Sequence, residues 1–472
     1  MTDRAPLSYA QLRMWLFAQL EPGSSHYNQL RVTRWSGPLQ VPALERALSE
    51  LIRRYEVLRA RFWSEDGGVF QRAGEAAPVT IPVEELEGEL PQSREKAAAR
   101  RAHAIAGQPF DLERGPLVRA VLLRLQPQEH HLVLVVHHIA SDEVSARLLL
   151  RELTKLYTAY LQGTGPVVAP GTGQYADYAA RQQERVGTPT EADDLSYWQA
   201  RLRGAPPLLE LPTDRTRPAR ASYEGGEVGF QLPATTVERL GALCQRERVT
   251  PFMVLFTVFA AVLARWSSRT DLIIGVPIAG RAEVELEDAI GCFANTLVMR
   301  TDASGDPTLR EMLRRVRAAV LDGLAHQELP FERLVQELHP VRSPRYHPVF
   351  QVMFVLRDFP PLDLAAPGIA IEYLPTADRG RALVDFALEL DRTRQGYSGE
   401  FAYNATLFER STVERLGADY LAVLDAMLED PELHLSRLPV LSGSPREAGT
   451  DATARALAVL ERLSEEDVQR LL

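Results

Sequence analysis

The chain has 472 residues, of which 45% are hydrophobic and 25% charged, a composition that suits two globular α/β domains of ordinary size. Its formal net charge is −10, from 63 acidic and 53 basic side chains. This balance excludes nucleic acid as the main partner, because contacts to phosphates need a basic face. The two cysteines are too few and too far apart for a disulfide scaffold or a cysteine zinc site.

No segment has the pattern of a targeting or membrane-spanning sequence. The N-terminus, MTDRAPLSYAQLRMW, lacks the basic and then apolar layout of a signal peptide. The most apolar segment, 251–263, is too short to cross a bilayer and is typical of a buried helix, with Thr250 as its cap and Pro251 in its first turn. We therefore expect a soluble, cytoplasmic protein with no membrane partner.

Helix and strand patterns alternate through the first part of the chain. Apolar residues spaced three and four apart predict helices at 9–20, 42–60 and 144–161. Two apolar runs of strand length, 117–125 and 131–139, are separated by QPQEH, which predicts a hairpin. These patterns predict a first α/β domain over residues 1–170.

A connector and a second domain follow. Gly- and Pro-rich sequence on either side of a helical stretch at 174–203 predicts a connector over residues 171–225. Alternating patterns then predict a second α/β domain over residues 226–442. Its predicted helices are 234–247, 250–266, 307–323, 330–338 and 410–429, and its predicted strands are 227–232, 272–277, 349–356, 384–391 and 397–404.

The last segment, 443–472, combines a flexible polar tract with an amphipathic helical pattern. Two interpretations stay open for it. It is an inert tail or a helix packed on its own protein, or it is a docking segment for a partner protein.

Two His-His pairs lie seven residues apart in EHHLVLVVHHIASDE, residues 129–143. His130 and His131 fall in the predicted turn, where exposed imidazoles are common. His137 and His138 follow a buried strand, so we expect their side chains to point to opposite sides. A histidine at such a strand exit is suited to accept a proton, although a purely structural role is also consistent with the pattern. No further ligands at characteristic spacing support a metal site.

HHIASDE, residues 137–143, resembles the HHxxxDG signature of the condensation domains of nonribosomal peptide synthetases. Further blocks resemble the motifs of this family in the same order: LSYAQLRMW at 7–15, RRYEVLRARF at 53–62, QYADYAARQ at 174–182, IGVPIAGRAEVELEDAIGCFANTLVMR at 274–300, HQELPFERLV at 326–335 and VRSPRYHPVFQVMF at 341–354. The resemblance covers about residues 5–442. SSHYNQ at 24–29, together with HQELPFE, is most similar to the subtype that joins two L-amino acids.

This resemblance implies an α/β fold of two chloramphenicol-acetyltransferase-like lobes arranged in a V with a central tunnel. It also implies an acyltransferase that forms a peptide bond, in which an aminoacyl amine attacks an upstream acyl or peptidyl thioester. Both substrates would be delivered on phosphopantetheine arms by upstream and downstream carrier proteins, next to an adenylation domain or other synthetase modules. The domain itself would bind no cofactor and no metal.

The resemblance also assigns roles to individual residues. His138 corresponds to the catalytic histidine of the family, and Asp142 is expected to pair with Arg281 in a buried salt bridge. The remaining assignments are His137 as support for the motif, Ser141, Glu143 and Asn295 as residues on the tunnel or its acceptor side, and Arg54 and Arg59 as structural residues.

Glu143 departs from the family pattern, which has Gly after the aspartate. A glutamate there could narrow the path of the acceptor, raise the pKa of His138 or contact the acceptor's ammonium group. The domain then either condenses substrates normally, uses an unusual acceptor, or is a silent platform that recruits a partner enzyme. Domains that recruit a cytochrome oxygenase in glycopeptide assembly lines also have DE here but typically lose the first histidine, whereas His137 remains in this chain. A freestanding acyltransferase with a soluble acceptor, making an amide or an ester, is a further alternative.

Overall fold

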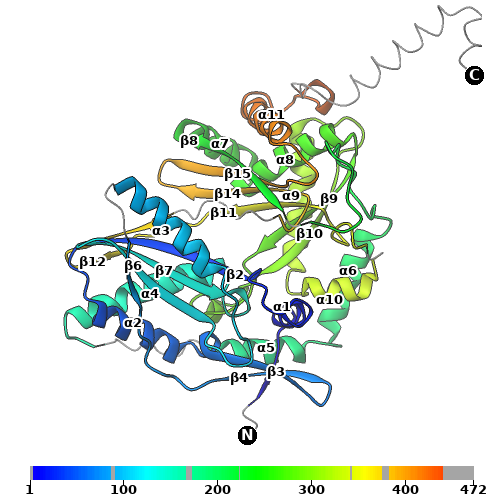
Figure 1. Cartoon of the computed structure of the whole chain (residues 1–472). Coiled ribbons are helices and arrows are strands. Elements are labelled where there is room, and N and C mark those ends of the chain that lie inside the picture. Colours follow the sequence, from blue (N-terminus) through cyan, green and yellow to red (C-terminus); the bar gives the residue numbers. More distant parts are fainter. Residues whose placement is uncertain are drawn as a thin grey trace, which may run out of the picture.

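The computed structural model describes residues 4–86, 91–165, 173–222, 224–340, 343–374 and 382–438. Two six-stranded sheets form the centres of two α/β lobes, which lie side by side in Figure 1. The predicted tail, 443–472, lies outside the described residues. The boundaries 1–170, 171–225 and 226–442 stay predictions.

The first lobe is built on a sheet with the strand order β12-β13-β2-β7-β6-β5. Its strands are β2 (Asn28–Ser36), β5 (Val83–Glu85), β6 (Val118–Gln126), β7 (Glu129–His137), β12 (Ala365–Ala366) and β13 (Ile369–Leu374). Its helices are α1 (Tyr9–Leu20), α2 (Val41–Arg54), α3 (Pro91–Ala106) and α4 (Glu143–Leu161), with short 3-10 helices at η1 (Glu56–Arg59) and η2 (His138–Ala140). A small sheet of β1 (Ala5–Pro6), β4 (Gly68–Ala73) and β3 (Ala60–Glu65) lies beside it.

Strand β7 is buried on both faces, which explains its nearly unbroken apolar sequence. Leu132, Leu134 and Val136 pack in the core that includes α2 and α4. Val133 and Val135 pack on the other face, in a cluster with α3. The strand therefore ends at a rigid position between two helical layers, and the HHIASDE motif begins there.

The second lobe has the strand order β10-β9-β11-β14-β15-β8. Its strands are β8 (Gly225–Pro233), β9 (Asp271–Ile278), β10 (Asn295–Asp302), β11 (Val352–Arg357), β14 (Phe386–Thr393) and β15 (Gly396–Asn404). Its helices are α7 (Ala234–Glu247), α8 (Pro251–Ser267), α9 (Leu309–Ala325), α10 (Phe331–Leu338) and α11 (Arg410–Glu429), with η3 (Val284–Leu286) and η4 (Leu435–Arg437). The connector holds α5 (Tyr175–Glu184) and α6 (Pro189–Leu202).

The predicted apolar helix at 251–263 is α8, a core helix of the second lobe. Thr250 accepts a hydrogen bond from the amide of Met253, and Pro251 stands in the first turn, as expected. No single helix in the described part of the chain is long and apolar enough to span a membrane; α7 and α8 meet such a test only as a pair bent by 101°.

Several predicted elements differ from the structure. The predicted helix at 42–60 ends at Arg54, because Tyr55 is extended and a 3-10 turn leads into β3. The predicted stretch at 174–203 is two helices, separated at Gly187 and Thr188. His130 and His131 are not in an exposed turn: both lie within β7 and are 3% exposed.

Two segments from the second half of the chain contribute to the first lobe. Strands β12 and β13 follow β11 of the second lobe in the chain but join the first sheet: β13 pairs with β2, with Leu374 opposite Val32, and β12 pairs with β13. The loop 279–294 between β9 and β10 also reaches into the first lobe, where Ile290 and Phe293 belong to its core. The two halves are therefore held together by shared core residues as well as by the connector.

Candidate active site

His138 lies at the junction of β7, η2 and α4. The strand ends at His137, and the backbone amide of His138 donates to the carbonyl oxygen of Tyr27 at 2.7 Å. His138 already belongs to a 3-10 turn, so strand alternation no longer sets the direction of its side chain, and the divergence of the two histidines stays a prediction. Both imidazoles contact the ring of Tyr27, with centroid distances of 6.2 Å for His137 and 6.3 Å for His138.

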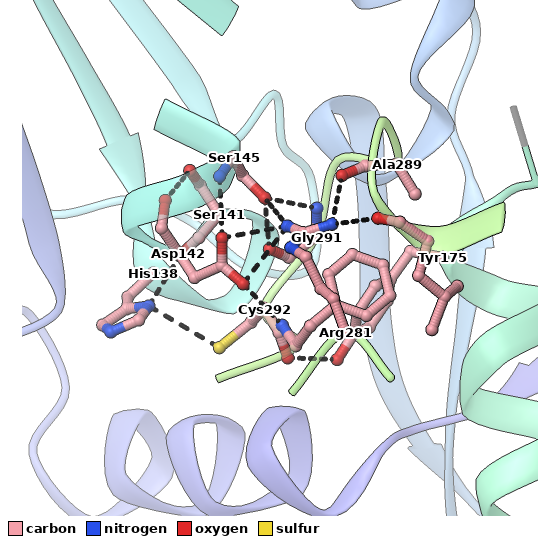
Figure 2. A network of polar contacts seen from close by, with 11 residues as sticks. His138, Ser141, Asp142, Ser145, Tyr175, Arg281, Ala289, Gly291 and Cys292 are labelled. Carbon is pink, nitrogen blue, oxygen red and sulfur yellow. Dashed lines mark hydrogen bonds and ion pairs between the residues drawn. The ribbon is translucent and has the colours of Figure 1, made fainter. Parts of the chain in front are cut away.

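The hydrogen bonds of His138 fix its tautomer. Nδ1 lies 2.7 Å from the carbonyl oxygen of Ser141 (Figure 2). A carbonyl oxygen only accepts, so Nδ1 carries the proton and donates it. The lone pair of the neutral ring is then on Nε2, the nitrogen on the opposite side of the ring. His138 is therefore oriented by the backbone as a proton acceptor through Nε2.

The surroundings keep this imidazole neutral. Burial lowers the pKa of His138 from its ordinary value; the hydrogen bond to Ser141 opposes this shift, and the nearby Arg13 guanidinium adds to it. The rise in the pKa of His138 considered as an effect of Glu143 is not found: the pKa is lowered overall, and Asp142 is the carboxylate that opposes this shift. Burial also lowers the pKa of His137 to about 3, so both rings of the pair are uncharged near neutral pH.

Asp142 connects the motif to the second lobe. It caps α4 by accepting a hydrogen bond from the amide of Ser145 at 2.7 Å, and its other oxygen accepts one from the amide of Phe293 at 2.9 Å. Nη2 of Arg281 donates to Oδ1 of Asp142 at 3.1 Å, so the ion pair expected from the resemblance is present in the structure. The side chains of Asp142 and Arg281 are 3% and 5% exposed, respectively.

The loop 279–294, which supplies Arg281 and Phe293, also forms hydrogen bonds with α4 and with the connector (Figure 2). Arg281 also donates to the carbonyl oxygens of Leu286 and Ala289 and to the hydroxyl of Ser145. The Ser145 hydroxyl donates to the carbonyl oxygen of Gly291 at 2.7 Å and accepts from its amide at 3.0 Å. We call this set of contacts between α4 and the loop 279–294 the interlobe latch.

Gly291 is required by the close packing of this latch. A Cβ atom at this position would stand 1.9 Å from Cδ2 of Tyr175, closer than any side chain tolerates. Tyr175, from α5 of the connector, also donates from its hydroxyl to the carbonyl oxygen of Cys292 at 2.7 Å. The connector therefore supports the loop that holds Asp142.

Cys292 stands next to His138, with Sγ 3.6 Å from Nδ1 of the imidazole. This approach resembles a Cys-His pair, but the nitrogen that faces the sulfur is already protonated. Burial, with a further contribution from Asp142, raises the pKa of the Cys292 thiol far above its ordinary value, so the group stays a thiol. The site therefore offers a neutral imidazole and no thiolate.

We predict that Cys292→Ala behaves like the wild-type protein in any assay of chemistry at His138. Because the thiol is buried and protonated, native protein should resist alkylation at Cys292 by iodoacetamide, and unfolded protein should react readily. Peptide mapping by mass spectrometry measures both rates. Rapid alkylation of Cys292 in the folded protein, together with loss of activity in the alanine variant, would contradict the assignment.

Glu143 begins α4 directly after its cap and is paired. Its Oε2 atom lies 2.5 Å from Nη2 of Arg31 on β2. The Arg31 side chain is 11% exposed and that of Glu143 37% exposed. The glutamate is therefore held by a partly buried cation that the sequence patterns did not identify.

The remaining predicted residues have structural contacts. Asn295 donates to the carbonyl oxygens of Gln327 and Leu329 and accepts from the amide of Phe331, and it also lines a pocket of about 80 Å³ beside Cys292. The hydroxyl of Ser141 is fully buried, so this residue acts on His138 through its carbonyl oxygen and does not face a tunnel.

Arg54 and Arg59 form hydrogen bonds with nearby residues of the first lobe. Arg54 donates to Glu50 at 2.6 Å, and Arg59 donates to the carbonyl oxygens of Ile52 and Gly74. These contacts agree with the structural role expected for both arginines.

Known proteins are similar to this chain in sequence and in fold over almost its whole length. The family model of the condensation domain matches residues 1–448, and the chain belongs to this family. It is 39% identical over 449 residues to phosphinothricin tripeptide synthetase PhsB of Streptomyces viridochromogenes. The aligned region covers 94% of this chain and 38% of that protein. It is 42% identical over 441 residues to phosphinothricin tripeptide synthetase PhsC of the same organism, covering 93% of this chain and 40% of that protein. The chain thus spans less than half the length of these curated relatives.

Solved structures confirm the predicted fold class. The X-domain from teicoplanin biosynthesis is 33% identical with a TM-score of 0.82, over 93% of this chain and 98% of that one. The X-domain in complex with OxyB, from the same biosynthesis, is 32% identical with a TM-score of 0.83, over 94% of this chain and 97% of that one. The chain is a condensation domain of the nonribosomal peptide synthetase type, with two chloramphenicol-acetyltransferase-like lobes.

Three features of the site were missed from sequence. Arg31 and Tyr27 lie on or next to β2, an element that the apolar patterns did not predict. Cys292 was considered only as one of two cysteines unsuited to a disulfide scaffold or a zinc site, although the motif IGCFANT places it within the loop that holds Asp142. The order of the motif blocks was the one available signal for its position beside His138.

Proposed function

We propose that this domain transfers an acyl or peptidyl group from the phosphopantetheine arm of one carrier protein to an amine on a second carrier. The observation that carries the proposal is the tautomer of His138, which is held by Ser141 with its Nε2 lone pair available. A silent domain has no need to orient a neutral imidazole in this way, with an ion pair from the other lobe fixing the following turn.

The proposed step is nucleophilic acyl substitution. The acceptor amine attacks the thioester carbonyl carbon, a C–N bond forms, and Nε2 of His138 accepts the proton that the nitrogen loses. The tetrahedral intermediate then releases the donor thiol, which takes up the proton, and the amide remains on the acceptor arm. Because both reactants are tethered, positioning supplies much of the acceleration, and a modest base is sufficient.

A second candidate function is supported by a specific observation. The X-domain structures are similar over almost the whole chain, and one of them is a complex with OxyB. Together with Glu143 in place of glycine, this similarity favours a platform that recruits a partner enzyme. Retention of both His137 and His138 and of the interlobe latch favours the catalytic function.

One experiment separates these functions and the soluble-acceptor alternative. A donor-loaded carrier is mixed with an amine acceptor, either on a second carrier or free in solution, and products are detected by intact-protein mass spectrometry. We expect amide product on the carrier-bound acceptor. Product with free amine alone supports the freestanding acyltransferase. No product with wild type, but product with Glu143→Gly, supports the platform silenced by the glutamate.

A further inference from the structure

Arg31 is a partly buried cation close to the HHIASDE motif. It faces Leu134 in the register of β2 and β7, three residues before the strand ends at His137. Nη2 of Arg31 lies 2.5 Å from Glu143, and Nη1 donates to the carbonyl oxygen of Leu30 at 2.9 Å. Nε is buried and has no hydrogen-bond partner among the residues that the structure describes. One donor of this guanidinium is therefore unsatisfied.

The unsatisfied donor lies on the edge of the guanidinium that binds Glu143. Nε and Nη2 form one edge of the planar group, and this edge is complementary to the two oxygens of a carboxylate. Glu143 uses only Nη2. The edge therefore has the geometry of a two-point carboxylate site that is half used by the protein's own side chain.

Glu143 lies close to arginines of both lobes. Glu143 raises the pKa of Arg147, one turn along α4, although burial lowers that pKa more strongly. It also contributes to raising the pKa of Arg357 on β11 of the second lobe. Arg357 has its own acidic partners, Glu389 and Asp391, whereas Glu143 is the one carboxylate in the described chain within ion-pair distance of Arg31.

We propose that Arg31 is the cationic half of a carboxylate-binding subsite at the start of α4, and that Glu143 fills this subsite from within the chain. An acceptor with a side-chain carboxylate must displace Glu143 and meets its negative charge, whereas a neutral or cationic acceptor does not. Glu143 is thus a specificity-determining residue that disfavours acidic acceptors. This role in acceptor choice rests on the proposed function, but the subsite itself does not.

Binding is tested without any transfer reaction. Glu143→Gly leaves Arg31 unpaired, so acetate should bind and, at roughly ten times its dissociation constant, raise the melting temperature of this variant by about 1–2 °C relative to chloride at equal ionic strength. The wild type should show no acetate-specific shift. The double variant Glu143→Gly with Arg31→Gln should also show none. Glu143→Ala serves as a second variant if the glycine protein does not fold.

A matched control is the more exposed pair of Arg300 and Asp271 in the second lobe, with an Nη2–Oδ2 distance of 2.7 Å and side chains 24% and 40% exposed. Asp271 accepts from both Nε and Nη2 of Arg300, so Asp271→Gly frees the same guanidinium edge at a more exposed position, where any acetate-specific stabilisation should be smaller. An equal acetate effect in Asp271→Gly, or in the double variant, would overturn the subsite. Stabilisation by inorganic phosphate but not by acetate would overturn its carboxylate specificity.

The transfer reaction tests the specificity. With carrier-bound glutamate and glutamine as isosteric acceptors, the wild type should prefer glutamine, and Glu143→Gly should move the product ratio toward glutamate by about tenfold. Acetate binding to Glu143→Gly without product from any acceptor, in wild type or variant, would support the subsite and contradict the proposed function. Product formation with an unchanged ratio and no acetate binding would contradict the subsite alone.

Discussion

His138→Ala is expected to reduce the rate of carrier-to-carrier transfer by about 100- to 10,000-fold, the range typical of a lost general base. The loss should appear in the single-turnover rate constant, because the imidazole accepts a proton in the transition state and contributes little to carrier docking. Quenched-flow mass spectrometry with saturating carriers measures this constant. The unfolding midpoint of the variant should stay close to that of the wild type, and a rate within about threefold of wild type would remove His138 from the reaction.

The same residue predicts the pH dependence of the reaction. Burial lowers the pKa of His138 below its ordinary value of 6.5, so the neutral, proton-accepting form persists below pH 6.5. The imidazole should therefore add no inflection to the pH profile of the single-turnover rate at or above pH 6.5, and the decline expected there comes from protonation of the acceptor amine, whose ordinary pKa is about 7.7–8.0. A second inflection at or above pH 6.5, in addition to that of the amine, would show that the imidazole is not in the environment described.

Arg281→Leu should lower the free energy of unfolding by about 3–5 kcal/mol, because it leaves the Asp142 carboxylate buried without its cation. We expect a value near the lower end, since the amides of Ser145 and Phe293 still donate to Asp142. Transfer should fall as well, because the loop 279–294 and the first turn of α4 lose their connection. Urea unfolding and the transfer assay give the two quantities, and Asp142→Asn in the same background should recover part of the stability.

A buried ion pair away from the site provides the control. Arg217 and Asp385 form one in the second lobe, with side chains 12% and 7% exposed. Arg217→Leu should lose stability comparably but keep the transfer rate of each folded molecule. If both variants lost transfer to the same extent, the effect of Arg281 would be general destabilisation, and the interlobe latch would have no specific part in the reaction.

The apolar patterns predicted those elements whose burial shows directly in sequence. The run at 131–139 corresponds to β7, and the helix beginning at Pro251 is α8. The exchange of β12 and β13 into the first sheet was not predictable in this way, because strand pairing between segments so distant in sequence leaves no local pattern. His130 and His131 were placed in a turn because polar residues next to Pro and Gln are typical of one, but the hairpin turns earlier and both side chains lie in the strand.

The sequence predicted residues of the site only where they belong to one of the motifs that resemble the family. The position of His138 and the partner of Asp142 came from motif order, and the structure contains that ion pair. The tautomer of His138 depends on a carbonyl three residues later, and the partner of Glu143 depends on a register between β2 and β7. Neither contact has a signature in a single sequence, because both arise from backbone geometry.

The proposed reaction requires that a carrier-borne arm reaches the neutral imidazole of His138. This is tested by loading a carrier protein with a bromoacetylated phosphopantetheine arm, incubating it with the wild-type domain at neutral pH, and mapping the covalent crosslink by peptide mass spectrometry. We predict alkylation of His138, through Nε2, and its loss in His138→Ala. Alkylation of Cys292 instead, or no crosslink from a carrier on either side of the domain, would contradict the assignment of His138 as the base.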